Sequence, residues 1–363
     1  MQQLLEAINA WNPVDDPLFW PDDRFDELAA QCFRHQYDNV PAYRRLCNGR
    51  GVTPADDPHY TEIPAVPTDA FKHVRLFADD AEPTRTFRTS GTTTDARGAH
   101  HFRTLDAYRA SLHPPFVRFC NPSDTPIRFL TIAPAPHNLP DSSLSFMLGE
   151  LVEHHGDTHS GFFVTTDTDG TWQLDTDGFA EALDRACSDD TETLVFGTAF
   201  AFAEFFVRLD DDWQLPEGSR IVETGGFKGR HRQLSRRDLY DAFTARLGVP
   251  ESRCLSEYSM TELSSQTYTD EISAADETTG RFRSPPWLAV DIVDPLKLTP
   301  LDPGETGLIR FFDLANIDSV SAVLTSDRGV AHPDNSFELL GRAPDSDLRG
   351  CSLTIEEIVS DDH

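Results

Sequence analysis

Hydroxyl and glycine residues gather in one short loop, residues 87–98, with the sequence FRTSGTTTDARG. Backbone N–H groups and Ser/Thr hydroxyls in such a loop can donate to phosphate oxygens, and Gly91 allows a close approach that a side chain would block. The loop is not a Walker A motif, because no Gly-Lys-Ser/Thr follows Gly91 and the phosphate-binding lysine is absent. Taken alone, the loop suits either a phosphate site or an ordinary turn.

Four downstream segments supply other groups that a nucleotide site needs. They are ETGGFKGR (223–230), SEYSMTELSSQ (256–266), TSDRG (325–329) and GRAPDSDLRG (341–350). The glycine pair Gly225 and Gly226 would let backbone lie against a flat adenine, and Glu262 offers Mg²⁺ a hard oxygen ligand. Asp327 and Arg342 could both bind the hydroxyls of one ribose. Each of these residues alone also suits a structural role: Glu262 as a helix cap, Asp327 in a turn and Arg342 on an exposed surface.

In this order the five segments resemble the adenylate-forming superfamily, which joins carboxylates to AMP before passing the acyl group on. The similarity is closer still to one branch, the LuxE-type acyl-protein synthetases of the bacterial bioluminescence fatty-acid reductase system. Three further stretches carry it: IPAVPTDAFK (63–72), DSSLSFM (141–147) and the LRGC that ends at Cys351. The resemblance extends from about residue 22 to residue 357. It implies a large α/β domain of the adenylate-forming N-terminal type, a small β-rich closing section and no full C-terminal lid domain.

The resemblance also implies a role for individual residues, with ATP and Mg²⁺ as cofactors. The hydroxyl-rich loop would bind the pyrophosphate end of ATP, and Glu262 would be the metal ligand. Tyr258 would pack near the adenylate, while Asp327 and Arg342 would hold the ribose. The nucleotide-binding residues are then Ser90, Gly91, Thr92, Thr93, Gly225, Gly226, Tyr258, Thr261, Asp327 and Arg342. The loop departs from the family pattern, in which a further glycine usually follows the threonines.

Two residues are predicted to be catalytic. Cys351 stands where the acylated cysteine of the family would be, and Arg349 and Arg342 would favour its thiolate if they lie close to it. Larger adenylate-forming enzymes have a catalytic lysine in a mobile C-terminal domain, but here no lysine follows Lys297. Lys228, beside the proposed adenine loop, is expected to replace it by stabilising developing charge. A surface lysine after a turn is the alternative interpretation.

The implied reaction has two halves. ATP first converts a carboxylate into an acyl-adenylate, and a thiolate then attacks the carbonyl and stores the acyl group as a thioester before a partner reductase accepts it. Apolar stretches at 196–206 and 141–147 favour a fatty acid, although such an aromatic stripe also suits a hydrophobic core. Two alternatives remain: a ligase that uses coenzyme A or a carrier protein as acceptor, and a non-catalytic nucleotide- or acyl-binding relative.

The hydrophobic pattern indicates which elements position these residues. Residues 22–48 predict two helices separated by a turn. The first would present one face with Phe25, Leu28, Cys32, Phe33 and Gln36 at helical spacing. From residue 128, short apolar runs alternate with helical patterns. That alternation is typical of α/β layers with a largely parallel sheet. After residue 285 the pattern changes to strands parted by Pro, Gly and Asp turns. We therefore expect a helical lead-in (1–60), an α/β core (61–285) and a β-rich closing section (286–363).

Composition excludes several classes of protein and partner. The formal net charge of −30 would repel nucleic acids and anionic membranes. No run approaches the roughly 18 apolar residues of a membrane helix and the first residues do not resemble a signal peptide, so a cytoplasmic protein without membrane insertion is expected. Six cysteines without a CxxC pair argue against a disulfide scaffold or a zinc site. A transition-metal site at the histidine pairs 100–101 and 154–155 is disfavoured, because Gly-Asp interrupts HHGDTH.

Overall fold

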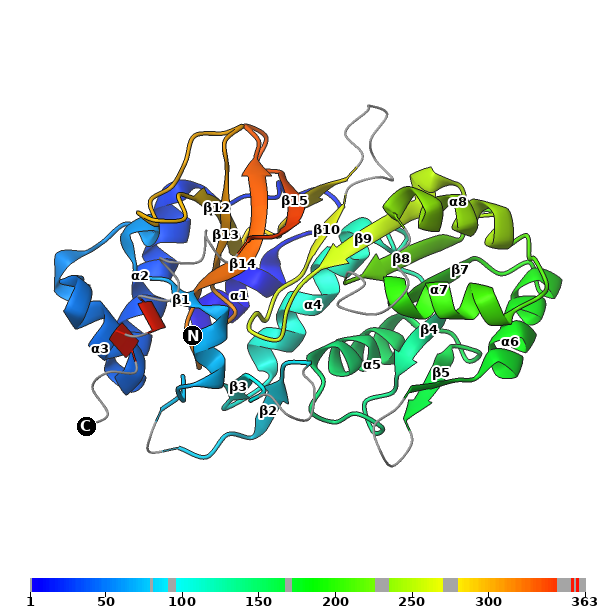
Figure 1. Ribbon diagram of the computed structural model, residues 1–363, viewed down its shortest axis with the longest axis horizontal. Helices are drawn as coiled ribbons and strands as arrows, with labels where there is room; N and C mark the ends of the chain where they lie inside the picture. The colour runs from blue at the N-terminus through cyan, green and yellow to red at the C-terminus, as the bar shows by residue number, and fades with distance from the viewer. Residues whose placement is uncertain are drawn as a thin grey trace. The chain divides into compact units, whose positions relative to one another are not determined.

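The chain forms two compact units (Figure 1). The computed structural model describes residues 2–78, 81–90, 96–166, 172–225, 235–269, 280–344, 354–355 and 357–358. Unit 1 comprises residues 1–114, 260–266 and 281–363, and unit 2 comprises residues 115–259 and 267–280. The three-part division at residues 60 and 285 stays a prediction. Within the described ranges, no helix has the length and apolar character needed to cross a bilayer.

Unit 2 is a mainly parallel sheet with helices between its strands. The strand order is β10-β9-β8-β7-β4-β5-β6, in which β10 and β6 pair antiparallel to their neighbours and the others are parallel. Its elements are β4 (Arg128–Pro134), α5 (Ser143–His155), β5 (Gly161–Thr166), β6 (Trp172–Leu174), α6 (Thr176–Ser188), β7 (Thr193–Thr198), α7 (Ala199–Arg208), β8 (Arg220–Thr224), α8 (Arg236–Leu247), the 3-10 turn η4 (Glu251–Arg253), β9 (Cys254–Tyr258) and β10 (Thr267–Thr269). The alternation expected from residue 128 onward is confirmed.

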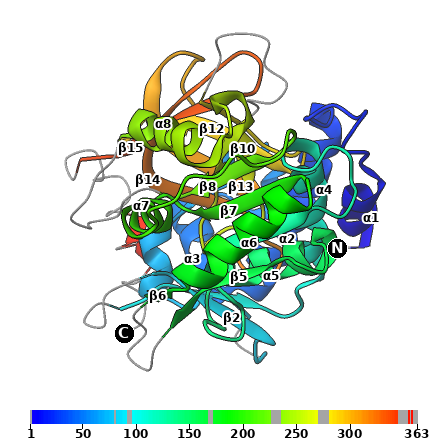
Figure 2. The same ribbon diagram turned by 90° about the vertical axis from the view of Figure 1, so that its right-hand side faces the viewer.

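Both faces of the central strand β4 are buried in unit 2. Leu130 and Ile132 belong to the cluster that α6, α7 and α8 complete on one face of the sheet (Figure 2). On the other face, the ring of Phe129 stacks on Phe116 of α4 (Asp106–Phe119), with ring centroids 5.6 Å apart. All seven residues of β4 are buried, which explains its continuous apolar sequence rather than an alternating one.

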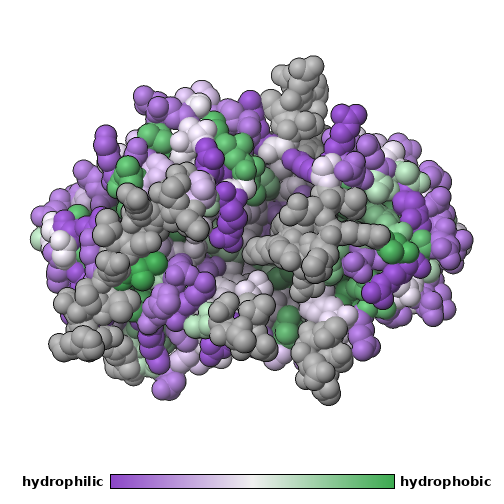
Figure 3. Space-filling view, in the orientation of Figure 1, coloured by the Kyte–Doolittle hydropathy of each residue, from purple (hydrophilic) through white to green (hydrophobic). Residues whose placement is uncertain are grey.

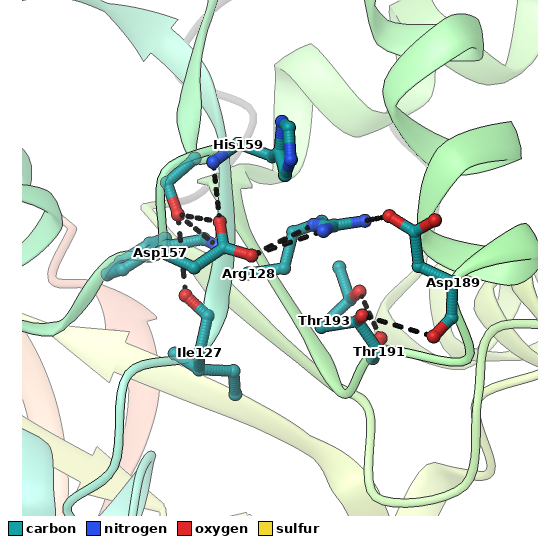
Figure 4. Close-up of polar contacts among 9 residues, drawn as sticks. Ile127, Arg128, Asp157, His159, Asp189, Thr191 and Thr193 are labelled. Atoms are coloured by element: carbon teal, nitrogen blue, oxygen red, sulfur yellow. Dashed lines mark hydrogen bonds and ion pairs between the residues drawn. The ribbon is translucent and has the colours of Figure 1, made fainter.

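A buried arginine fixes the amino-terminal edge of this sheet (Figure 4). The Arg128 guanidinium donates to Asp157 Oδ2 at 3.2 Å and to Asp189 Oδ2 at 3.1 Å. Asp157 lies in the loop after α5 and Asp189 caps the C-terminus of α6, so one side chain ties both connections to β4. Gly225 follows β8 and Tyr258 ends β9, and both therefore lie at the opposite, carboxyl ends of the parallel strands. We therefore assign the Arg128 network a structural role.

Unit 1 contains an antiparallel sheet, a two-stranded ribbon and three N-terminal helices. The sheet order is β12-β13-β14-β15-β11, with β1 parallel to β14, and β2 pairs with β3. Its elements are α1 (Gln2–Ala10), α2 (Asp22–Asn39), α3 (Pro41–Arg50), the 3-10 turns η1 (Pro54–Asp56), η2 (Tyr60–Glu62) and η3 (Thr68–Lys72), β1 (Val66–Pro67), β2 (Arg85–Arg88), β3 (Ala99–Phe102), β11 (Arg281–Arg283), β12 (Leu288–Val293), β13 (Thr306–Asp313), β14 (Ala322–Ala331) and β15 (Phe337–Arg342). The predicted β-rich closing section is therefore present as β12 to β15.

Helices α2 and α3 match the two predicted for residues 22–48. The predicted face of α2 is buried in unit 1, at Phe25, Leu28, Cys32, Phe33 and Gln36. The buried Gln36 amide donates to the carbonyl of Asn316 at 2.8 Å, so this face joins α2 to the turn after β13 by a polar contact as well. Pro41 begins α3, where its missing N–H costs no intrahelical hydrogen bond.

The face of the molecule drawn in Figure 3 is mostly hydrophilic among the described residues. On the face in Figure 3, polar side chains predominate and hydrophobic residues form small, separate groups. This distribution fits the net charge of −30, which places many carboxylates in solvent. The large hydrophobic residues that are exposed among those described are Val14, Phe19, Val207, Leu296 and Leu340.

Candidate active site

Asp327 and Arg342, the two residues predicted to hold one ribose, are brought together in unit 1. They are directly opposed on the antiparallel strands β14 and β15, and Arg342 Nε lies 3.1 Å from Asp327 Oδ1. The arginine side chain is 63% exposed and the aspartate only 14%. An ion pair with so exposed a partner adds little stability, because water screens it. The pair thus presents a carboxylate and a guanidinium together without serving as a major structural contact.

Glu262, the predicted magnesium ligand, lies in the unit 1 segment 260–266. Glu262 is only 7% exposed, although glutamate is an acidic residue and this one lies outside any helix or strand. Asp313, the last residue of β13, holds the segment in place. The Asp313 carboxylate accepts from the amides of Ser264 and Ser265 at 2.8 and 2.9 Å, and from Ser265 Oγ and the Ala315 amide. Complete burial, opposed by these hydrogen bonds, raises the pKa of Asp313 to about 6.

His100, on β3, holds the residue before Glu262. Its Nδ1 lies 2.8 Å from the carbonyl oxygen of Thr261, and because a carbonyl only accepts, Nδ1 carries the proton. Burial lowers the pKa of His100 to about 4, with the Thr261 hydrogen bond acting in the opposite direction. The ring is therefore neutral near pH 7. The sequence drew attention to this histidine only as a metal candidate.

Acidification should destabilise the protein through His100. Because its folded pKa is near 4 and its unfolded pKa near 6.5, the unfolded state binds more protons between these values. The stabilisation is complete above pH 6.5 and is lost as pH falls towards 4, by about 2 kcal/mol between pH 7 and pH 5. Urea unfolding of wild type and His100→Asn at both pH values measures this. We expect the difference between the two proteins to change by that amount, since Asp313 titrates in both and cancels; a constant difference would contradict the assignment.

In unit 2, the half-buried Glu223 and the buried Glu257 link the carboxyl ends of β8 and β9, where ligands bind in open parallel sheets. Ser256 donates to Glu223 and Thr224 donates to Glu257, and each pair is also directly opposed in the strand register. Burial, with a smaller contribution from the Glu223 charge, raises the pKa of Glu257 to about 7. No pattern in the sequence marked these acids, apart from their place next to the glycine and tyrosine motifs.

Two candidate residues lie at these strand ends: Gly225 directly follows β8, and Tyr258 is the last residue of β9. Gly225 has a φ of 65°, in the left-handed region that favours glycine, so another residue there would strain the backbone. Tyr258 ends β9 with its side chain half-buried, and its carbonyl accepts from Thr267 Oγ1 at 2.9 Å. Both lie in unit 2, whereas Thr261, Glu262 and the Asp327–Arg342 pair lie in unit 1.

The base of the hydroxyl-rich loop is an extension of the β2–β3 ribbon. Thr89 and Gly98 close it, because the Thr89 amide donates to the Gly98 carbonyl at 3.0 Å and the Gly98 amide donates to Thr89 Oγ1. Ser90 follows this closure and is exposed. The predicted site residues that lie outside the described residues are Gly91, Thr92, Thr93, Gly226, Lys228 and Cys351.

Comparison with known proteins decides the family. The profile described as acyl-protein synthetase, LuxE, matches residues 14–360. The chain belongs to this family. It is 22% identical over 376 residues to the long-chain-fatty-acid–luciferin-component ligase of Vibrio harveyi, covering 97% of this chain and 95% of that protein. The protein of the same name from Aliivibrio fischeri is 21% identical over 350 residues, covering 92% and 88%.

The fold of this LuxE family member is also found among solved adenylate-forming ligases. An open conformation of 2-hydroxyisobutyryl-CoA ligase, in complex with 2-HIB-AMP and CoA, superposes with a TM-score of 0.63 at 14% identity. The match covers 93% of this chain and 75% of that one. The same ligase in its thioesterification state gives a TM-score of 0.64 at 15% identity. The predicted α/β adenylate-forming fold and the predicted ligase class are confirmed.

The aromatic stretch 196–206, considered for the acyl pocket, contributes to the core of unit 2. Phe202 and Phe205 on α7 are fully buried, and the ring of Phe202 contacts Phe243 of α8 with centroids 4.7 Å apart. In this LuxE family member, both side chains therefore belong to the hydrophobic core, which is one of the two interpretations of this stretch. Phe200 and Phe206 on the same helix are half-buried, and an acyl-binding role for this stretch and for 141–147 stays a prediction.

Proposed function

We propose that this protein is an ATP-dependent acyl-protein synthetase. It activates a long-chain fatty acid as the acyl-adenylate, loads the acyl group on Cys351 and passes it to a partner acyl reductase. Membership of the LuxE family over residues 14–360 and the names of the curated relatives support this activity. The observation that carries the proposal is the Asp327–Arg342 pair, which joins two separated sequence motifs at one place.

The chemistry of that pair suits a ribose. A carboxylate accepts from the two neighbouring hydroxyls of the sugar, and a guanidinium donates to their oxygens, in charge-assisted hydrogen bonds. Asp327 is held in place because its amide donates to Thr325 Oγ1 at 3.0 Å. Arg342, with its largely exposed side chain, can turn towards the sugar without breaking a buried contact.

In the first half-reaction, an oxygen of the fatty-acid carboxylate attacks the α-phosphorus of ATP. The bond from that phosphorus to the bridging oxygen breaks, and pyrophosphate leaves with the electron pair. The carboxylate of Glu262 fits the hard oxygen donor that Mg²⁺ requires, and the bound ion would neutralise phosphate charge. Ser90 and the adjoining loop would donate to the phosphates, and Lys228 is proposed to stabilise charge on the reacting groups.

In the second half-reaction, the Cys351 thiolate attacks the acyl carbonyl and AMP leaves, which forms a thioester. The other cysteines are poor candidates for this step, and Cys254 among them is fully buried. Burial raises the pKa of Cys32 and Cys47 to about 12, and also raises the pKa of Cys120 and Cys187. A thiol with such a pKa is scarcely ionised near neutral pH, and only the thiolate is a good nucleophile.

Acid-dependent exchange of labelled pyrophosphate into ATP tests the first half-reaction. We expect exchange to require a fatty acid and Mg²⁺, and Asp327→Asn to raise the KM for ATP about tenfold through loss of charge-assisted hydrogen bonds. Asp334→Asn is the matched control, since that aspartate pairs with Arg283 in the turn before β15. Binding of ATP without exchange for any acid would instead support a non-catalytic relative, and acyl-CoA as the final product would support a coenzyme A ligase.

A further inference from the structure

Two successive carbonyl groups around Glu262 are held from different directions. His100 on β3 donates from Nδ1 to the Thr261 carbonyl at 2.8 Å, and Asn316, in the turn after β13, donates from Nδ2 to the Glu262 carbonyl at 2.7 Å. Both side chains are buried, and all these residues belong to unit 1. Each hydrogen bond restrains the orientation of one peptide group.

Fixing two adjacent peptide planes fixes the residue between them. The peptide that follows Thr261 contains the amide of Glu262, and the next peptide contains its carbonyl. A residue has only two soft backbone dihedrals, which relate these two planes. With both peptide groups restrained, the direction of the Glu262 Cα–Cβ bond is restricted, and with it the region that the carboxylate can reach.

Asn316 and His100 are themselves held by buried partners. Asn316 Oδ1 accepts from Ser264 Oγ at 2.6 Å, which orients the amide so that Nδ2 faces Glu262. The His100 ring packs between Phe71 and Phe102, with centroids 5.8 and 4.2 Å away. Neither donor can therefore rotate away at low cost.

We propose that His100 and Asn316 are positioning residues for adenylate formation, which set the direction of the Glu262 carboxylate by holding the carbonyls on either side of it. This inference rests on the proposed function, in which Glu262 binds the ion that accompanies ATP. It adds His100 and Asn316 to the residues that serve the reaction, and both lie outside the five nucleotide motifs. The same contacts would merely support the fold if the direction of Glu262 did not matter to the reaction.

Three variants separate positioning from stability. His100→Phe keeps an aromatic ring against Phe71 and Phe102 but removes the donor, whereas His100→Asn retains a donor near the place of Nδ1. Asn316→Ala removes the second donor. Tyr43→Phe is the matched control, because it removes a buried hydroxyl that donates to the Pro64 carbonyl at 2.9 Å, in the same unit and away from the segment.

The full-length protein is assayed in two ways. Hydrogen–deuterium exchange of the peptide that contains residues 260–266 is followed without ligands, and pyrophosphate exchange is followed at saturating Mg²⁺ and ATP. We expect His100→Phe and Asn316→Ala to speed amide exchange in that peptide and to lower kcat at least tenfold, with the KM for ATP within about threefold of wild type. His100→Asn should recover most of the kcat, and Tyr43→Phe should keep it.

Normal kcat in His100→Phe and Asn316→Ala would overturn the inference, whatever the amide exchange. So would an equal loss of kcat in Tyr43→Phe, because the effect would then follow stability alone. Wild-type protein that exchanges no pyrophosphate with any acid would overturn the proposed function and this inference with it, and that result is visible before any variant is made. Should Asn316→Ala fail to fold, the comparison of His100→Phe with His100→Asn still decides.

Discussion

Cys351→Ser is expected to lose the covalent acyl label completely while it retains pyrophosphate exchange. Wild-type protein incubated with a radioactive fatty acid, ATP and Mg²⁺ should keep label after denaturation and release it to hydroxylamine, as a thioester does. Serine has a hydroxyl of far higher pKa than a thiol, so the second half-reaction stops. The first half-reaction does not involve the thiol, and its rate should stay within about threefold of wild type.

Cys187→Ser is the control for that experiment. Cys187 is the half-exposed cysteine among those that the structure describes, and its Sγ lies 3.3 Å from the Gln214 carbonyl. Labelling of this variant should equal that of wild type. If Cys351→Ser were labelled as fully and as labile to hydroxylamine, the acceptor would be another group, and the proposed thioester at Cys351 would be wrong.

Local pattern was sufficient to predict most of the elements. The apolar spacing in residues 22–48 depends on neighbours three and four positions apart, and it predicted the buried face of α2. The alternation of strands and helices from β4 to α8 was equally visible, because each apolar run matches one buried element. These features arise from contacts that are close in sequence or are repeated along it.

The opposition of Asp327 and Arg342 depends on a detail that no sequence pattern revealed. Ala331 pairs with Phe337 and Gly329 with Leu339, but the register shifts between Arg328 and Gly329. Without that bulge Asp327 would face Gly341, and Arg342 would project from the opposite face of the sheet. The two motifs were predicted to act on the same sugar, yet one extra residue in β15 is what lets their side chains meet.

The polar contacts that hold Glu262 were beyond sequence reasoning for a different reason. Asn316 and His100 are separated from Glu262 and Thr261 by 54 and 161 positions, and neither stands in a recognisable motif. Asp313 is the last residue of a strand whose sequence indicated only β structure. A buried side chain that binds a distant backbone group leaves no periodic signal, so such residues emerge only when the fold is known.

Glu262→Gln should lower the kcat of pyrophosphate exchange about a hundredfold, the size of effect seen when one group that stabilises transition-state charge is removed. Glutamine keeps the size of the side chain and its capacity for hydrogen bonds, but it lacks the charge that a hard divalent ion prefers. We expect the Mg²⁺ concentration for half-maximal exchange to rise as well. Glu192→Gln, which removes a carboxylate that pairs with Arg220, should change neither quantity.

The double variant Glu262→Gln/Asn316→Ala relates this result to the positioning residues. If Asn316 acts only through the direction of the Glu262 carboxylate, its removal has little left to disturb once the carboxylate is gone. The two losses of kcat should then be far from multiplicative, with the double variant within about threefold of Glu262→Gln. Multiplicative losses would mean that Asn316 supports the reaction by a route independent of Glu262, and kcat for Glu262→Gln within threefold of wild type would remove Glu262 from the reaction altogether.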